Sequence, residues 1–141
     1  MQSTAKASNP SPRPKTDLDE AFWAHCAEQR LCFQRCTRCE RWRHLPRMMC
    51  PDCGSDAWTW QPSSGRGRLF SWTVSHRAPH PAFAAEVPYT VALVELEEGV
   101  RMVSGLREVS PEALQLDLPL EVVFESLEGG GALPFFRPRK S

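Results

Sequence analysis

Beyond residue 67 the chain alternates short apolar runs with turn residues, which is the pattern of a small β-rich domain. The runs are rich in β-branched and aromatic side chains, which favour strands. They predict five strands, at residues 68–75, 89–96, 100–106, 120–125 and 133–137. Glu97-Glu98-Gly99 is a tight connection, so we expect the second and third strands to form a hairpin. Ser110 followed by Pro111 predicts a short helix after the third strand, and this order is typical of a five-stranded OB-fold barrel.

An apolar stripe at helical spacing precedes this region. Leu18, Phe22 and Cys26 recur every four residues, and acidic residues beside Leu18 suit the first turn of a helix. We therefore predict a helix within residues 16–30. Its stripe can pack on its own domain or dock on another protein, and the spacing does not distinguish the two. Residues 1–15 are polar and proline-rich, which predicts a disordered tail.

Composition narrows the class of protein. The 141 residues carry 17 basic and 17 acidic side chains, so the bulk charge gives no reason to expect a polyanion as partner. No apolar run approaches the roughly 20 residues that span a bilayer, and the first residues lack the pattern of a signal peptide. We therefore expect a cytoplasmic protein. In a reducing compartment its six cysteines are better explained by a metal than by disulfides.

The cysteines carry the strongest chemical signal. Two C-x-x-C turns, Cys36 with Cys39 and Cys50 with Cys53, are separated by ten residues and predict one tetrahedral zinc site. Four thiolates close the coordination sphere, so we expect one structural Zn²⁺ per chain and no open catalytic position. A redox dithiol would need a βαβ context, which the sequence lacks. The chain is then divided into a tail (1–15), a helix (16–30), a rubredoxin-like zinc ribbon (31–62), an OB-fold domain (63–138) and a second tail (139–141).

Single residues of the ribbon also allow predictions. Gly54 follows the second C-x-x-C turn and suits a positive φ, whereas Glu40 stands at the corresponding place after the first. His44 lies between the two turns, and we expect a solvated loop histidine. Cys26 and Cys32 fall outside the ligand spacing, so we expect reduced thiols that pack as small apolar groups.

Several short motifs follow one another in a recognisable order. They are Phe22-Trp23, Pro46-Arg47 ahead of the second cysteine pair, Ser64-Gly65-Arg66-Gly67, Pro88-Tyr89, Val94-Glu95-Leu96 and Glu98-Gly99-Val100. Over about residues 17–138 the chain resembles the family of zinc-ribbon-plus-OB-fold acyl-CoA-associated proteins, long catalogued as a domain of unknown function. Members usually carry a glycine before the fourth strand, where this chain has Leu118-Pro119-Leu120.

The resemblance implies an accessory subunit in a hetero-oligomer rather than an enzyme acting alone. Members of the family associate with thiolase-fold enzymes and with hotdog-fold enoyl-CoA hydratases, where they complete the acyl-CoA channel or hold the assembly together. Settings of this kind include steroid side-chain breakdown, early isoprenoid synthesis and the C-acylation of phenolic metabolites. The residues of this chain do not select among them, and they leave open whether CoA touches it.

A few residues are candidates for contacts with a ligand or a partner. On the helix, Phe22 and Trp23 are aromatic anchors that we expect to dock on the partner enzyme. Arg66 and Arg68 flank Gly67 in what we expect to be a flexible connector, where they can face a ligand or mark a hinge. The long 76–88 segment is expected to form a loop that gates an acyl chain, with Phe83 as its apolar contact. Its titratable groups, which acid–base chemistry would need, are His76, His80 and Glu86.

The ribbon also concentrates positive charge, although the chain as a whole is neutral. Its basic residues are Arg30, Arg35, Arg38, Arg41, Arg43 and Arg47. Such a face can meet CoA phosphates, an acidic partner or nucleic acid, or can simply be solvated. A single-stranded nucleic-acid-binding zinc-ribbon and OB module is the alternative function. The strands at 89–96 and 100–106 offer only Tyr89 and Arg101 for stacking and phosphate contacts, which disfavours it.

Overall fold

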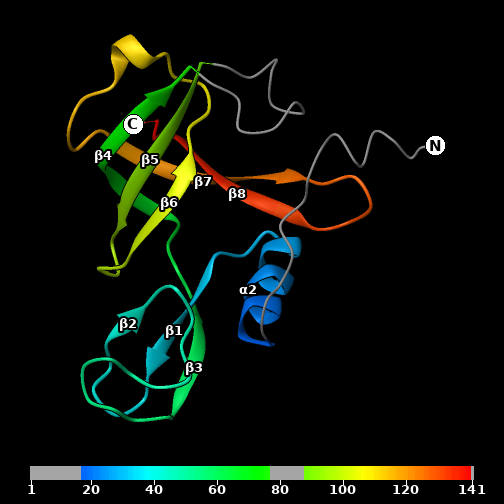
Figure 1. Cartoon of the computed structure of the whole chain (residues 1–141), viewed down its shortest axis with the longest axis vertical. Coiled ribbons are helices and arrows are strands. Elements are labelled where there is room, and N and C mark those ends of the chain that lie inside the picture. Colours follow the sequence, from blue (N-terminus) through cyan, green and yellow to red (C-terminus); the bar gives the residue numbers. More distant parts are fainter. Residues whose placement is uncertain (1–16, 77–87, 141) are drawn as a thin grey trace.

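The chain folds into a helix, a three-stranded ribbon and a five-stranded barrel, arranged around a shared apolar core (Figure 1). The computed structural model describes residues 17–76 and 88–140. Helix α2 spans Asp17–Ala27, and the ribbon strands are β1 (Cys32–Cys36), β2 (Trp42–Arg43) and β3 (Trp58–Pro62). The barrel consists of β4 (Arg66–Ser75), β5 (Tyr89–Leu96), β6 (Arg101–Gly105), β7 (Pro119–Ser126) and β8 (Ala132–Pro138), with the 3₁₀ turn η2 (Pro111–Ala113) between β6 and β7.

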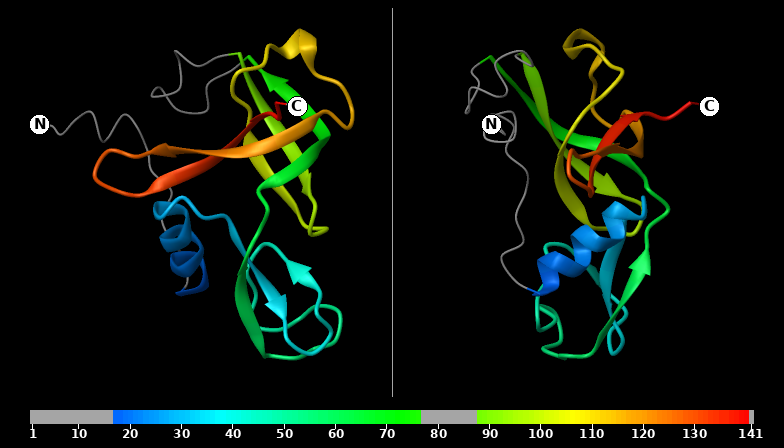
Figure 2. Two further views of the ribbon diagram at one scale, coloured as in Figure 1. Left: turned by 180° about the vertical axis from the view of Figure 1, so that it is seen from behind. Right: turned by 90° about the vertical axis from the view of Figure 1, so that its right-hand side faces the viewer.

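The barrel strands run in the order β6-β5-β4-β7-β8, each antiparallel to its neighbours. The two outer strands then meet, as both views of Figure 2 show. Leu106, just after β6, forms a parallel bridge with Phe136 of β8, and the Arg107 N–H donates to the Phe136 carbonyl at 2.8 Å. The barrel is therefore nearly closed, which leaves little exposed strand edge. This arrangement confirms the predicted mainly β fold with an OB-type barrel.

Alternation along the strands builds the barrel interior. Ala92, Val94 and Leu96 of β5 are buried, as are Leu69 of β4 and Leu120 of β7. Successive side chains of a strand face opposite sides, so the period-two pattern that predicted the strands also fills the core. Each barrel strand begins and ends within two residues of its predicted bounds.

The glycines of the Gly65-Arg66-Gly67 motif are required by close packing. A Cβ on Gly67 would lie 2.4 Å from the carbonyl oxygen of Glu95, because β4 and β5 approach closely there. Gly65 has φ +77°, and a Cβ on it would lie 2.6 Å from Val122 Cγ1. Close packing thus explains both glycines without the flexible hinge that the sequence also allowed. The connector is also tied down, because the Ser63 hydroxyl donates to the Glu98 carboxylate at 2.6 Å.

Helix α2 packs against β1 of the ribbon and β8 of the barrel (Figures 1 and 2). Its stripe faces this chain's own core: Phe22 and Cys26 are buried in one cluster with Phe33 of β1 and with the barrel residues. The Phe22 ring stacks on the Phe33 ring with 6.5 Å between centroids. The Trp23 ring contacts Phe22 in an edge-to-face arrangement, with 5.1 Å between centroids. The stripe thus packs on its own domain, which answers the question that the spacing left open.

Part of the predicted organisation falls outside the described residues. This applies to the tail at 1–15 and, within the 76–88 segment, to His80, Phe83 and Glu86. His76 is described and is exposed at the end of β4. No helix of the described part is long and apolar enough to cross a membrane.

Candidate metal centre and neighbouring cavity

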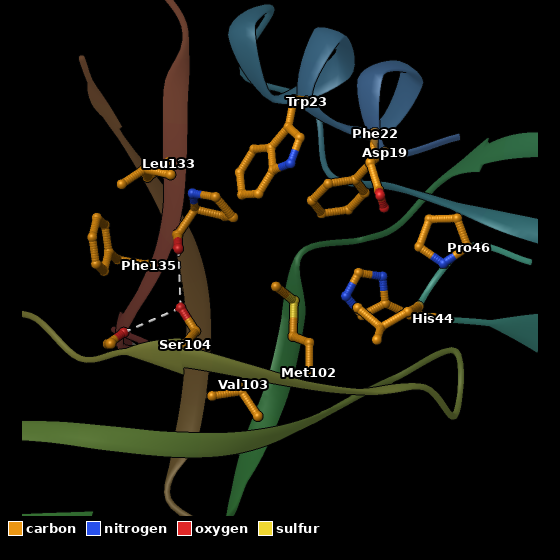
Figure 3. A pocket seen from close by; sticks show the side chains of 13 residues that line it. Asp19, Phe22, Trp23, His44, Pro46, Met102, Val103, Ser104, Leu133 and Phe135 are labelled. Carbon is orange, nitrogen blue, oxygen red and sulfur yellow. Dashed lines mark hydrogen bonds between the residues drawn. The ribbon is translucent and has the colours of Figure 1, made fainter. Parts of the chain in front are cut away.

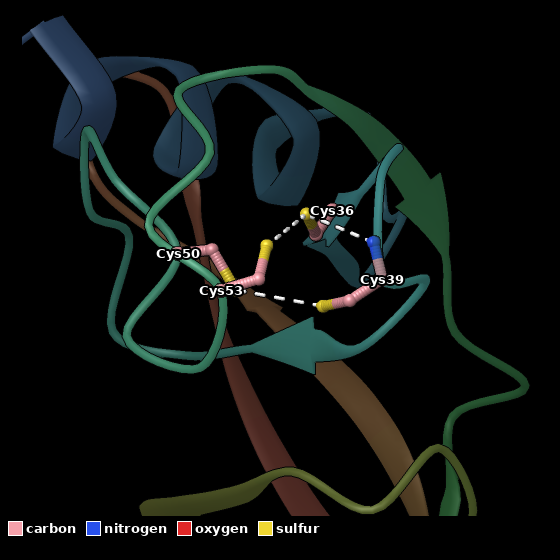
Figure 4. Close-up of side chains that lie close together, drawn as sticks. All are labelled: Cys36, Cys39, Cys50 and Cys53. Carbon is pink, nitrogen blue, oxygen red and sulfur yellow. Dashed lines mark hydrogen bonds between the residues drawn. The ribbon is translucent and has the colours of Figure 1, made fainter.

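The four predicted ligands come together at one end of the ribbon (Figure 4). Their sulfur atoms all lie within 4.8 Å of one another. Two cross-pairs, Cys36 with Cys53 and Cys39 with Cys50, have Sγ–Sγ distances of 3.6 Å. A tetrahedral zinc with Zn–S bonds of about 2.3 Å requires sulfur atoms roughly 3.8 Å apart. The cluster therefore has the dimensions of a structural Cys₄ zinc site, with both ligand pairs held by turns.

The two turns are built in the same way, although one ends in glycine and the other in glutamate. The Glu40 N–H donates to the Cys36 carbonyl at 3.0 Å, and the Gly54 N–H donates to the Cys50 carbonyl at 2.8 Å. Glu40 has φ +66° and Gly54 has φ +78°, so both adopt the left-handed conformation that closes the turn. Glu40 thus takes the backbone conformation that usually belongs to glycine, at a local cost of about 1 kcal/mol.

Backbone N–H groups favour the thiolate form of the first cysteine in each turn. The N–H groups of Cys39 and Arg38 both point at Cys36 Sγ at 3.4 Å, and they lower the pKa of Cys36 to about 6. The N–H of Cys53 likewise lowers the pKa of Cys50. Because metal-bound cysteines must be deprotonated, this arrangement suits zinc binding at neutral pH.

The remaining two cysteines lie apart from the metal cluster. Cys26 and Cys32 are both buried and reduced, as predicted. Burial raises the pKa of Cys26 to about 12, with Cys32 adding to the rise. Burial also raises the pKa of Cys32. Both therefore stay protonated near neutral pH and act as small apolar groups of the core.

His44 is not the solvated loop histidine that the sequence led us to expect. Its ring lies 5.0 Å from that of Phe22 and 5.2 Å from that of Phe33. Burial lowers the pKa of His44 to about 4, against an opposing effect of Asp19. The side chain is therefore neutral at pH 7 and helps to join α2 to the ribbon. The loop position gave no sign of this, because the contacts come from residues far away in the chain.

Phe22 also differs from its predicted role as a docking residue. Only 4% of it is exposed, so it has no free face to offer a partner. Trp23 is half-buried at the edge of the same cluster and keeps an accessible side. The predicted pair is thus divided between a core residue and a surface residue.

Arg66 and Arg68 lie within β4, so the prediction of a loop position is wrong for both. Arg66 pairs with Glu97 at 3.6 Å, and Arg68 forms ion pairs with Glu95 and Asp117. The contacts with Glu95 and Asp117 raise the pKa of Arg68. An anionic ligand at either arginine would have to compete with carboxylates that are already in place.

A cavity of about 300 Å³ opens where the helix, the ribbon and the barrel meet. Figure 3 shows Trp23 and Phe22 projecting from α2 towards Met102 of β6, with His44 on the ribbon side. Most of the wall is apolar, and the mouth includes Leu45. Sequence reasoning missed this cavity, since no single element contains it. The available signal was Leu45, a large apolar residue in a ribbon too small to bury it.

The fold and the cysteine cluster define the class of protein, a rubredoxin-like zinc ribbon joined to an OB-fold barrel. Residues 23–59 match the family described as "ChsH2, rubredoxin-like zinc ribbon domain", and residues 60–125 match "ChsH2, C-terminal OB-fold domain". The chain therefore belongs to the ChsH2-type, or DUF35, family.

Three similar proteins place the chain within that family. It is 43% identical to the "Probable enoyl-CoA hydratase alpha subunit" of Thermomonospora curvata over 90% of this chain, but spans only 40% of that protein. It is 31% identical to a "DUF35 domain-containing scaffold protein" of Methanocaldococcus jannaschii, over 77% of this chain and 78% of the relative. In a solved structure titled "Ltp2-ChsH2(DUF35) aldolase", one chain matches with a TM-score of 0.78 and 42% identity, covering 89% of this chain and 98% of that one.

Proposed function

We propose that this chain is a non-catalytic accessory subunit of an acyl-CoA enzyme. It binds an enzyme of the thiolase fold, or a hotdog-fold hydratase, and helps to form the acyl-CoA channel. The observation that carries the proposal is the match to nearly the whole of a chain in the structure titled "Ltp2-ChsH2(DUF35) aldolase". The scaffold and hydratase-subunit names of the other relatives support the same role.

The chemistry of the cysteines supports a structural part in such an assembly. Four thiols belong to the metal cluster, and the other two are buried. A thiol such as Cys26, with a pKa of about 12, remains protonated at pH 7 and is a poor nucleophile. Every cysteine of the chain is thus engaged in holding the fold.

Zinc has a defined place in this function. When bound, it would supply the cross-link that holds the two turns of the ribbon together, since a ribbon of this size has little core of its own. The ribbon in turn carries one wall of the cavity through the loop after His44. Losing the metal is therefore expected to release part of the surface that faces a partner.

Co-purification followed by an activity assay tests the proposal directly. The tagged chain is expressed in its native host, and the proteins that co-purify are identified by mass spectrometry. We expect a thiolase-like or hydratase-like enzyme, whose kcat/KM for its acyl-CoA thioester rises at least about tenfold when the chain is added. The isolated chain should show no turnover of the thioester.

Two results would contradict the proposal. Turnover of an acyl-CoA thioester by the chain alone would make it an enzyme. Recovery of ribosomal or replication proteins, together with oligonucleotide binding that weakens steeply with salt, would favour the nucleic-acid alternative.

A further inference from the structure

Large apolar side chains are exposed on the ribbon loop and beside the cavity. Leu45, Met48 and Met49 of the ribbon loop and Val103 of β6 are each between 58% and 67% exposed. Leu45 and Val103 line the mouth of the same cavity, and Met48 and Met49 lie three and four residues beyond Leu45. Exposed apolar groups that gather around a concave site are typical of interaction surfaces. Leu116, the other large apolar residue exposed to this degree in the described part, lies outside this group.

An arginine without a carboxylate partner lies inside this apolar group. In the described ranges, the ion pairs engage every arginine except Arg38, Arg43 and Arg47, all three of them in the ribbon. Arg43 is buried, whereas Arg38 and Arg47 are exposed. Arg47 directly precedes Met48, so an unpaired positive charge stands beside the exposed methionines.

The backbone that carries Arg47 is fixed from inside the ribbon. The Arg47 N–H donates to Gln34 Oε1 at 2.7 Å, and the Arg47 carbonyl accepts from Arg43 Nη2 at 2.9 Å. Arg43 Nε donates to the same Gln34 oxygen at 2.9 Å. Gln34 and Arg43 are both buried, so the loop backbone is anchored at Arg47 before any partner arrives. Such preorganisation lowers the entropy lost on binding.

We propose that the 45–49 loop, together with Trp23 and Val103 at the cavity rim, is the surface that docks on the partner enzyme. We call it the loop–cavity surface. Its occupant is a surface segment of the enzyme that presents a bulky apolar side chain next to a carboxylate. The apolar side chain fills the cavity, and the carboxylate pairs with Arg47. This inference rests on the proposed function and adds to it the place and the chemistry of the contact.

Charge and shape favour this occupant over others. A small apolar ligand in the cavity would leave Met48 and Met49 exposed. A nucleic acid would pair with Arg47 but would leave the apolar side chains uncovered. Two-fold pairing of this surface with a second copy would bring two unpaired Arg47 side chains into one interface.

Position-specific cross-linking tests the surface. The full chain carries the photoreactive residue p-benzoylphenylalanine in place of Met49, or in place of Leu116 as the control, and is irradiated in its native host. We expect position 49 to cross-link to an acyl-CoA enzyme, at a segment with an acidic residue within a few residues of the attachment point. Position 116 should give at least about tenfold less product.

Charge variants test the pairing. Arg47→Glu and Val103→Asp should each lower the amount of co-purified enzyme about tenfold or more, with zinc content unchanged. Arg30→Glu makes the same change of charge at an exposed arginine outside both zinc-binding turns, and Leu116→Asp matches Val103→Asp. Both controls should stay within about twofold of the parent chain.

The outcomes separate the surface from the function. Equal losses from Arg47→Glu and Arg30→Glu, or equal cross-linking at positions 49 and 116, would overturn the surface. Cross-links to a second copy or to another part of the same chain would also overturn it. A cross-link confined to position 49 but made to a protein outside acyl-CoA chemistry would contradict the proposed function and support the surface.

Discussion

Phe22 allows the sharpest test of how the molecule is assembled. It is 4% exposed and lies in contact with three rings, those of Trp23, Phe33 and His44. Phe22→Ala leaves a cavity at the junction of α2 with the ribbon, for which we expect a loss of about 3–5 kcal/mol in the free energy of unfolding. Phe22→Leu keeps most of the volume and should cost no more than about 1.5 kcal/mol. Trp23→Ala, at a half-buried site, should fall between them.

Urea unfolding followed by tryptophan fluorescence measures these losses, and Trp23 lies close enough to report on the helix. Zinc content should remain at one ion per chain in all three variants, since the cysteine cluster does not include α2. A loss below about 1 kcal/mol for Phe22→Ala would refute the reasoning, because truncating a large residue of the shared core should destabilise the fold by more than that. The helix would then be a surface element, and Phe22 would return as a docking residue.

Three further predictions concern protons, glycines and metal. The pKa of His44 is about 4 in the fold against 6.5 in the unfolded chain, so the stability that a neutral His44 contributes is complete above pH 6.5 and is lost as the pH falls towards 4. Between about pH 7 and about pH 5, the free energy of unfolding should fall by about 2 kcal/mol more in the parent than in His44→Gln. The control His76→Gln, at an exposed position, should behave like the parent. Gly67→Ala forces a Cβ against the backbone of β5 and should lower the free energy of unfolding, measured by denaturant titration, by about 2–3 kcal/mol. In Gly105→Ala the new Cβ meets only side chains, so the loss should be smaller. Equal losses would contradict the close-approach argument. Cys36→Ser should abolish stoichiometric zinc in metal analysis and unfold the ribbon, and retention of one zinc per chain would contradict the four-cysteine assignment.

Local patterns predicted the strands and the metal ligands because both are short-range properties. A strand that buries one face repeats with period two, and a C-x-x-C turn sets the spacing of its own thiols. Even Glu40, which departs from the usual turn residue, did not mislead the assignment of ligands. The geometry of the turn requires its left-handed φ of +66°, although glutamate does not favour that conformation.

Long-range packing could not be predicted in this way. Phe22 and His44 are separated by more than twenty residues. The apolar stripe left open what Phe22 packs against, and the position of His44 between the two C-x-x-C turns suggested a solvated side chain. Only the folding of α2 onto the ribbon brings their rings to within 5.0 Å and excludes water from both. The two carboxylates that pair with Arg68 belong to Glu95 and Asp117, which are likewise distant from it in the chain. Charges that appear free in a sequence are therefore poor guides to ligand contacts until the ion pairs are known.

The shared core explains how a surface made from three elements can act as one unit. Phe22 of α2, Phe33 of the ribbon and Phe136 of the barrel belong to the same buried cluster. The Ser63–Glu98 hydrogen bond ties the connector to the turn between β5 and β6. Because the ribbon cannot move freely against the barrel, the 45–49 loop and Val103 keep a fixed separation across the cavity mouth. A partner that contacts both therefore meets a preformed surface, and loosening the connector should weaken binding even though no contact residue has changed.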